Sequence, residues 1–176
     1  IQKQNAAVAI GALHALKKLG WAIKDQQLRK GIAKAKWPGR LEKIRWKGMD
    51  ILIDCAHNPH AADQLSLERL KWKGEEKGVP WILAIQKQKD ASSMIRSLIR
   101  PNDLAWIIPV PEHTSWTQNE LSKLCPNYSK QLRNAVNIEE ALSMILLENQ
   151  WSIPSPVITG SIYLAGDLAR KNLINL

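Results

Sequence analysis

The chain has 176 residues, of which 45% are hydrophobic, and a formal net charge of +9, so it is long and apolar enough for one domain with a buried core, or for one domain plus part of another. No stretch approaches the roughly 20 apolar residues that cross a bilayer, and the N-terminus lacks the charged-then-apolar order of a signal peptide. Its two cysteines are too few for a disulfide scaffold, so we expect a reduced, cytoplasmic protein with no membrane partner.

Two helices are predicted at the start of the chain. Apolar residues recur at helical spacing over residues 3–19, and Gly20 then supplies a C-terminal stop. A second helix is predicted over residues 25–35, before Trp37-Pro38-Gly39 breaks the pattern. Neither helix can bury its apolar face alone, so we expect the tail of a preceding domain or a docking hairpin. Because the chain also lacks an initiator Met, we expect it to be a piece of a longer protein.

From residue 41 onward, strands and helices alternate. The helix starts carry recognisable caps: Asn58 precedes Pro59, and Thr117 and Asn137 each precede a glutamate by three residues. This alternation predicts an α/β fold with a mostly parallel sheet and helices on both faces. The predicted strands span residues 41–47, 49–54, 81–85, 104–110 and 157–159, and the predicted helices span residues 59–73, 90–99, a short segment after 117, 138–149 and 162–170.

In such a fold the loops that follow the strands lie along one edge of the sheet, where ligands bind. Asp54 and His57 stand there, at the point where a buried strand ends and a helix begins. A capped turn and a functional site explain this pair equally well. A helix N-terminus beside them would attract an anion. The same edge is predicted to hold residues 86–90, residues 112–114 and Gly160-Ser161.

Arg40 and Ser161 are two further candidates with ordinary structural explanations. Pro38-Gly39 is a common turn pair, and composition alone favours a turn with Arg40 as a surface charge over a guanidinium that binds phosphate. Ser161 can serve only as a helix cap, or its hydroxyl can help to hold a carboxylate.

Several motifs are absent from the sequence. There is no GxGxxG dinucleotide fingerprint, no GxxxxGK[ST] P-loop and no GxSxG nucleophile turn, so a self-contained enzyme is hard to build from this chain. No CxxC or HxxxH pair predicts a metal site. The positive charge suits an anionic partner, but its basic residues are scattered, and we expect no specific nucleic-acid binding.

Four segments together resemble the C-terminal part of folylpolyglutamate synthase/dihydrofolate synthase, a family of ATP-dependent Mur ligases. In order along the chain they are Asn5-Ala-Ala-Val-Ala-Ile, Trp37-Pro-Gly-Arg-Leu-Glu, Asp54-Cys-Ala-His-Asn-Pro-His and Thr159-Gly-Ser-Ile-Tyr. The resemblance covers essentially the whole chain. It implies that residues 1–36 are the last helices of a P-loop ATPase domain, and that residues 37–176 form the Rossmann-like C-terminal domain.

The resemblance also implies chemistry and site residues. In the family, ATP phosphorylates a carboxylate of a dihydropteroate or folate, and L-glutamate then attacks the acyl phosphate. Residues matching Asn5, Arg40 and Asp54 contact ATP, and residues matching His57 and Ser161 help to place the nucleotide or L-glutamate. Arg40, Asp54 and His57 are thus the implied catalytic residues. The upstream P-loop domain is the implied partner and binds most of the Mg²⁺. The isolated chain would therefore be inactive, and we expect the protein to be a monomer.

Three features depart from the family pattern. Cys55 and Gln86 stand where the family usually has Gly, and an Arg often found after the fourth strand is missing. These departures leave open an alternative: a divergent, non-catalytic Rossmann-like module that binds a nucleotide or a protein. An intact P-loop upstream would favour the ligase.

Overall fold

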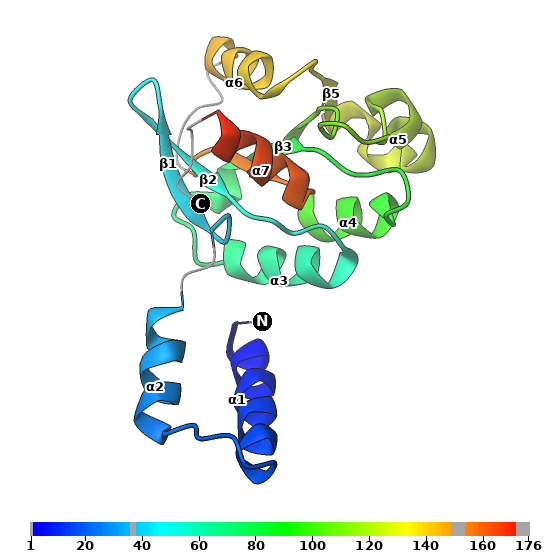
Figure 1. Cartoon of the computed structure of the whole chain (residues 1–176). Coiled ribbons are helices and arrows are strands. Elements are labelled where there is room, and N and C mark those ends of the chain that lie inside the picture. The colour runs from blue at the N-terminus through cyan, green and yellow to red at the C-terminus, as the bar shows by residue number, and fades with distance from the viewer. Residues whose placement is uncertain (1, 36–37, 149–153, 172–176) are drawn as a thin grey trace. The chain divides into compact units, whose positions relative to one another are not determined.

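The structure is a computed structural model that describes residues 2–35, 38–148 and 154–171 (Figure 1). The chain forms two compact units, Ile1–Trp37 and Pro38–Leu176, which are described separately below. Among the helices described, none combines the length and the apolar character needed to span a membrane.

The first unit consists of two helices, α1 (Gln2–Lys18) and α2 (Asp25–Lys34), which confirms both predicted helices to within one residue. The Lys17 ammonium pairs with the Asp25 carboxylate at 2.8 Å. Helix α2 buries none of its residues. An open apolar depression therefore remains on the unit, lined by Leu13, Ile23, Gln27, Leu28, Gly31, Ile32 and Ala35.

The second unit is built on a six-stranded sheet with the order β1-β2-β6-β3-β4-β5. Strand β1 pairs antiparallel with β2, and every other pair of neighbours is parallel, which confirms the predicted mostly parallel sheet. The strands are β1 (Glu42–Trp46), β2 (Met49–Ile53), β3 (Pro80–Leu83), β4 (Leu104–Ile107), β5 (Leu132–Asn134) and β6 (Val157–Thr159).

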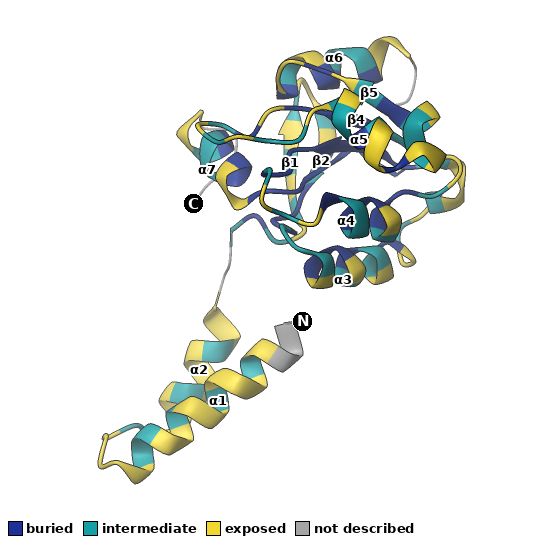
Figure 2. Cartoon of the chain, turned by 90° about the vertical axis from the view of Figure 1, so that its right-hand side faces the viewer, coloured by how far each residue is buried: buried dark blue, intermediate teal, exposed yellow. Residues whose placement is uncertain are grey.

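Helices cover both faces of this sheet, as predicted, and each face has its own apolar core (Figures 1 and 2). Side chains alternate along β3, so Trp81 and Leu83 enter one core while Ile82 enters the other. The first core is covered by α3 (Pro59–Arg69), α4 (Ala91–Leu98) and α5 (Gln118–Leu124), and the second by α6 (Ile138–Leu147) and α7 (Ile162–Arg170).

The predicted helix caps are present. Asn58 accepts a hydrogen bond from the Ala61 N–H at 2.9 Å, with Pro59 in the first turn of α3. Thr117 and Glu120 form a reciprocal capping box on α5, and Asn137 caps α6. These local signals fixed where the helices begin.

Three features differ from the predicted elements. Strand β5 was not predicted, because it has only three residues and only Leu132 is buried. Helix α3 ends at Arg69 rather than near residue 73, and Gly74 then adopts a φ of 76°. Two short 3-10 helices, Glu75–Lys77 and Pro126–Gln131, were also missed.

Candidate functional site

The segments that follow β2 and β6 lie side by side at the carboxyl edge of the sheet. The Asp54 N–H donates to the Ile158 carbonyl at 3.0 Å, and the Gly160 N–H donates to the Ala56 carbonyl at 3.0 Å. Gly160 has a φ of 106°, and a Cβ atom there would lie 2.5 Å from the Ala84 carbonyl oxygen. Only glycine therefore lets these segments approach the end of β3 so closely.

The predicted turn at Pro38-Gly39 places Arg40 against this edge. The Cys55 N–H donates to the Gly39 carbonyl at 2.7 Å, and the Leu41 N–H donates to Asp54 Oδ2 at 3.2 Å. The Gly39 N–H donates to Glu42 Oε2 at 2.7 Å. The turn is thus tied on both sides of Arg40, so the backbone on which its side chain stands is well defined.

The Arg40 side chain is three-quarters buried, yet its guanidinium has few partners. Its Nη1 lies 3.7 Å from Asp54 Oδ1, and its side chain is 25% exposed. This distance is an ion pair rather than a hydrogen bond. Among the described residues the guanidinium forms no hydrogen bond, so most of its donors remain available for another anion.

Asp54 and Cys55 are both buried beside Arg40. Burial raises the pKa of the Asp54 carboxyl, although the Arg40 charge and the Leu41 N–H act in the opposite direction. Burial, with the neighbouring Asp54 charge, raises the pKa of the Cys55 thiol to about 11. Cys55 is therefore a neutral packing residue at physiological pH and not a nucleophile.

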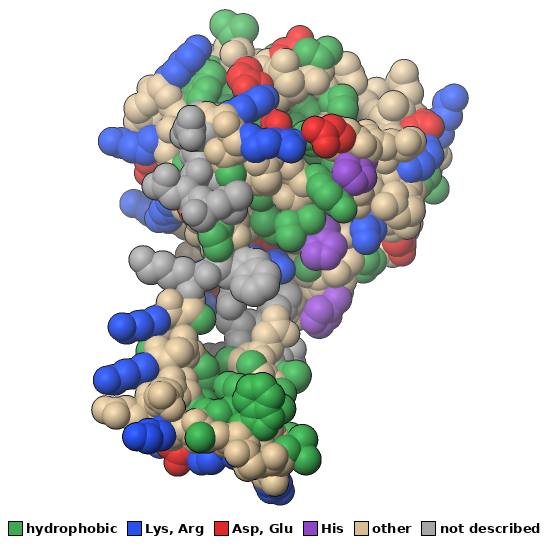
Figure 3. Space-filling view, viewed as in Figure 1, with side chains coloured by type: hydrophobic (Ala, Val, Ile, Leu, Met, Phe, Trp, Pro, Cys, Tyr) green, Lys and Arg blue, Asp and Glu red, His purple; other side chains and the backbone are tan. Residues whose placement is uncertain are grey.

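His57 and His113 present their rings in the same way. His57 Nδ1 lies 2.8 Å from the Cys55 carbonyl oxygen, and His113 Nδ1 lies 2.8 Å from the Pro111 carbonyl oxygen. A carbonyl only accepts, so Nδ1 donates in each case and Nε2 is left for other contacts. Figure 3 shows histidine side chains on the visible face of the second unit.

His113 was predicted only as part of residues 112–114 and had no assigned role. Its ring stacks on that of Tyr163 in the first turn of α7, with the ring centroids 3.9 Å apart. Glu112, just before it, has a φ of 60°, which is uncommon for a residue with a side chain. The contact left no local sequence signal, because His113 and Tyr163 are far apart in the chain.

Ser161 has the structural role that the sequence allowed. Its hydroxyl oxygen accepts from the Tyr163 N–H at 3.2 Å and caps α7. Because Ser161 is buried, its hydroxyl stabilises the start of α7 and is not part of an exposed surface. Asn5, in contrast, is an exposed residue of α1 and belongs to the first unit.

The loops after β3 and β4 are joined to each other at the same edge. The Lys87 N–H donates to the Thr114 carbonyl at 2.9 Å, and the Lys87 ammonium pairs with Glu120 at 2.6 Å. Gln86, one of the three departures from the family pattern, is buried and forms a β-bridge with Ser115. Within the described residues, no cluster of three His, Cys, Asp or Glu side chains could hold a metal ion.

The sequence matches a defined family. The family profile described as the C-terminal domain of dihydrofolate synthetase matches residues 39–171. A probable dihydrofolate synthetase of Schizosaccharomyces pombe is 29% identical over 178 residues, covering 96% of this chain and 42% of that protein. A folylpolyglutamate synthase of Lacticaseibacillus casei is 29% identical over 176 residues, covering 98% of this chain and 38% of that protein.

Solved structures show the same fold. A folylpolyglutamate synthase of Thermotoga maritima aligns with a TM-score of 0.60 at 25% identity, covering 92% of this chain and 36% of that chain. A Mycobacterium tuberculosis folylpolyglutamate synthase complexed with ADP aligns with a TM-score of 0.69 at 22% identity, covering 88% of this chain and 36% of that chain. This chain therefore spans well under half the length of the relatives it matches.

Proposed function

This chain belongs to the family of the dihydrofolate synthetase C-terminal domain, and we propose that it forms one wall of the active site of an ATP-dependent ligase that joins L-glutamate to a dihydropteroate or a folate. The match confirms the resemblance drawn from the four sequence segments. The named relatives are dihydrofolate and folylpolyglutamate synthases, which supports this reaction class.

The proposed reaction has two steps. ATP supplies a phosphoryl group to the substrate carboxylate, which gives an acyl phosphate and ADP. The amine of L-glutamate then attacks the acyl carbon, so that an amide bond forms, phosphate leaves and the amine loses a proton. This chain would contribute groups that bind and orient the anionic reactants.

The observation that carries the proposal is the state of Arg40. Its side chain is only 25% exposed, and its one ion pair with a described residue is at 3.7 Å, so guanidinium donors are available to a second anion. The planar guanidinium can donate two hydrogen bonds to phosphate oxygens, and its charge can neutralise a phosphoryl group in transfer. Asp54, to which Leu41 donates a backbone hydrogen bond, holds Arg40 in place.

His57 and Ser161 are assigned to substrate positioning. The Nε2 atom of His57 is available because Nδ1 is bonded to the Cys55 carbonyl. Ser161 orders the N-terminus of α7, where free amides favour a carboxylate such as that of L-glutamate. Cys55 does not obstruct this arrangement, since it is 2% exposed and packs beneath Gly39.

The remaining parts of the site are assigned to the rest of the protein. We propose that residues 1–36 are the last helices of an upstream P-loop ATPase domain and that Asn5 contacts ATP. That domain would hold most of the Mg²⁺. On this proposal the isolated chain is inactive, and the complete ligase is a cytoplasmic monomer.

Replacing Arg40 with Ala in the full-length ligase tests the assignment. We expect a loss of ATP-dependent glutamate addition of on the order of a hundredfold or more, because one preorganised cationic donor is removed. Arg45→Ala is the matched control, since Arg45 is a solvent-exposed arginine of the same unit. Unchanged turnover and ATP affinity in Arg40→Ala, with normal folding, would contradict the proposed role.

A further inference from the structure

The proposed reaction needs a group that removes a proton from the amine of L-glutamate. An α-amine is largely protonated at neutral pH, and an ammonium group has no lone pair with which to attack an acyl carbon. Arg40 and Asp54 do not suit this task, because the guanidinium stays protonated and the carboxylate is its ionic partner at 3.7 Å. A neutral imidazole is the side chain that most often accepts such a proton.

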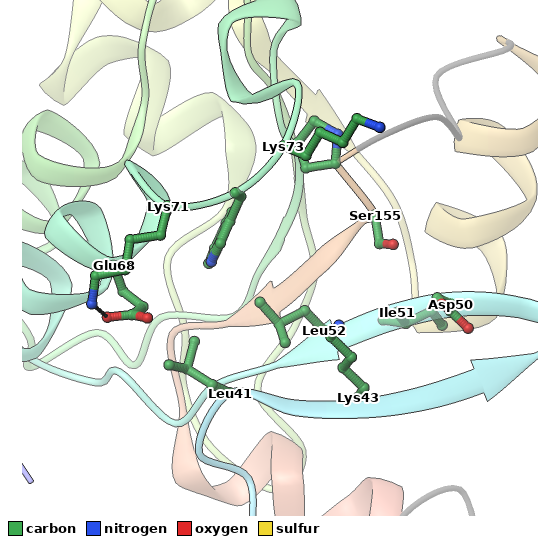
Figure 4. A pocket seen from close by; sticks show the side chains of 11 residues that line it. Leu41, Lys43, Asp50, Ile51, Leu52, Glu68, Lys71, Lys73 and Ser155 are labelled. Atoms are coloured by element: carbon green, nitrogen blue, oxygen red, sulfur yellow. Dashed lines mark hydrogen bonds and ion pairs between the residues drawn. The ribbon is translucent and has the colours of Figure 1, made fainter.

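The groove between the β1–β2 hairpin and the C-terminal end of α3 offers no such acceptor (Figure 4). None of the described residues that line it is a histidine, and its basic residues are lysines, which are protonated at neutral pH. Both of its carboxylates have cationic partners, since Glu68 pairs with a lysine at 2.6 Å and Asp50 with an arginine at 3.3 Å. The carboxyl edge of the sheet, in contrast, carries the imidazoles of His57 and His113.

These two imidazoles have different neighbours. Burial raises the pKa of the Asp54 carboxyl, and the charges of Arg40 and His57 both oppose that rise, so His57 belongs with the pair that is assigned to phosphate. His113 instead stacks on Tyr163 in the first turn of α7, with the ring centroids 3.9 Å apart. The start of this helix carries the free amides that are assigned to a carboxylate of L-glutamate. His113 is thus the imidazole on the L-glutamate side of the site.

Local contacts fix the His113 ring in an orientation that suits a proton acceptor. Its Nδ1–H donates to the Pro111 carbonyl at 2.8 Å, so the neutral ring carries its lone pair on Nε2. The His113 N–H donates to the Val110 carbonyl at 3.2 Å and closes the turn. Glu112, beside it, pairs with Arg170 of α7 at 3.7 Å, so the loop contacts this helix at two points. The half-buried ring is therefore held in place before a substrate binds.

We propose that His113 is the general base that activates L-glutamate, an inference that rests on the proposed function. With a carboxylate of L-glutamate at the start of α7, Nε2 takes one proton from the ammonium group, and the freed lone pair attacks the acyl carbon. The carbon–nitrogen bond forms, and the bond from the acyl carbon to the phosphate oxygen breaks. A second proton of the amine leaves with the phosphate, and the imidazolium then returns its proton to water.

His113→Gln in the full-length ligase tests this step. We expect kcat for glutamate addition to fall about a hundredfold or more, the usual contribution of a general base. Formation of the acyl phosphate should be unchanged, because that step takes no proton from L-glutamate. It is measured as the hydroxamate that forms when hydroxylamine replaces L-glutamate. Hydroxylamine is largely unprotonated at neutral pH, so it attacks the acyl phosphate without a base.

His113→Phe keeps a ring that can stack on Tyr163 and should show the same selective loss. His60→Gln is the matched control, since His60 is an exposed histidine in the first turn of α3, and it should leave both activities unchanged. Normal glutamate addition in either His113 variant, or loss of both activities in both variants, overturns the inference and leaves the proposed function standing. Failure of the wild-type ligase to form the hydroxamate and to add glutamate overturns both.

Discussion

Gly39 occupies a position where a side chain has no room. Its φ is 69°, and a Cβ atom would lie 2.5 Å from the Cys55 sulfur and 3.3 Å from the Ala165 Cβ. This close contact joins the turn that carries Arg40 to the segment that carries Asp54. Cys55 therefore fills the space beneath the turn, and the geometry of the candidate site depends on the Gly39–Cys55 pair.

Gly39→Ala is expected to lower the free energy of unfolding by about 2–4 kcal/mol, from left-handed backbone strain and overpacking together. Adding Cys55→Ala should recover the overpacking part but not the strain, so the two substitutions should couple by about 1 kcal/mol or more. Urea denaturation of the two single variants and the double variant measures this coupling. Gly166→Ala is the control: among the described residues, no atom beyond its chain neighbours and its own helix backbone lies within 4 Å of the added Cβ. It should be neutral or stabilising by up to about 1 kcal/mol. Purely additive effects at Gly39 and Cys55 would contradict this account.

The candidate residues differed in how much the sequence could predict. Asp54 and His57 were predictable as edge residues, because an apolar strand and a helix cap flank them. Arg40 was not predictable from composition, since its burial depends on contacts between the turn and residues beyond β2. The stacking of His113 on Tyr163 joins residues far apart in the chain and left no local signal.

At the level of elements, one buried acidic residue joins the starts of two strands to a helix. Asp103 precedes β4 at the amino edge of the sheet, opposite the candidate site. It accepts from the Val79 N–H at 2.8 Å, the Trp81 Nε1–H at 3.0 Å and the Arg100 N–H at 2.9 Å. The buried Arg69 guanidinium at the end of α3 also donates to it, at 2.8 Å from Nη2.

Asp103→Ala is therefore expected to lower the free energy of unfolding by about 3–5 kcal/mol, because a buried guanidinium and buried donors lose their acceptor. Chemical denaturation monitored by Trp fluorescence measures the change. Asp50→Ala removes an aspartate of a solvent-exposed ion pair and should alter stability by no more than about 0.5 kcal/mol. A loss below about 1 kcal/mol for Asp103→Ala would show that the network contributes little.

Elements with strong local sequence signals were predicted well, and those with weak signals were missed. Helices with a side-chain cap and a helical apolar pattern were predicted at the correct start, as with α3, α5 and α6. The short edge strand β5 was missed, because three residues carry no readable alternation and its pairing with β4 is a tertiary contact.

At the level of the whole molecule, the two units differ in what they bury. The second unit has an apolar core on each face of its sheet. Helix α2 of the first unit buries no residue, and apolar side chains such as Leu13 and Ile32 line an open depression there. A short helix pair that buries so little is marginal in water. The first unit thus needs further surface to cover it, whereas the second has its own interior.

A chain beginning at Pro38 should therefore fold on its own. Its thermal midpoint should lie within about 3 °C of the main transition of the complete 176-residue chain, because both sheet cores are retained. A peptide of residues 1–37 should show little helix by circular dichroism. Calorimetry of the two longer chains, at matched concentration and pH, makes the comparison. A midpoint lowered by about 10 °C or more, or a helical and cooperatively melting 1–37 peptide, would show that the two units do not fold as argued.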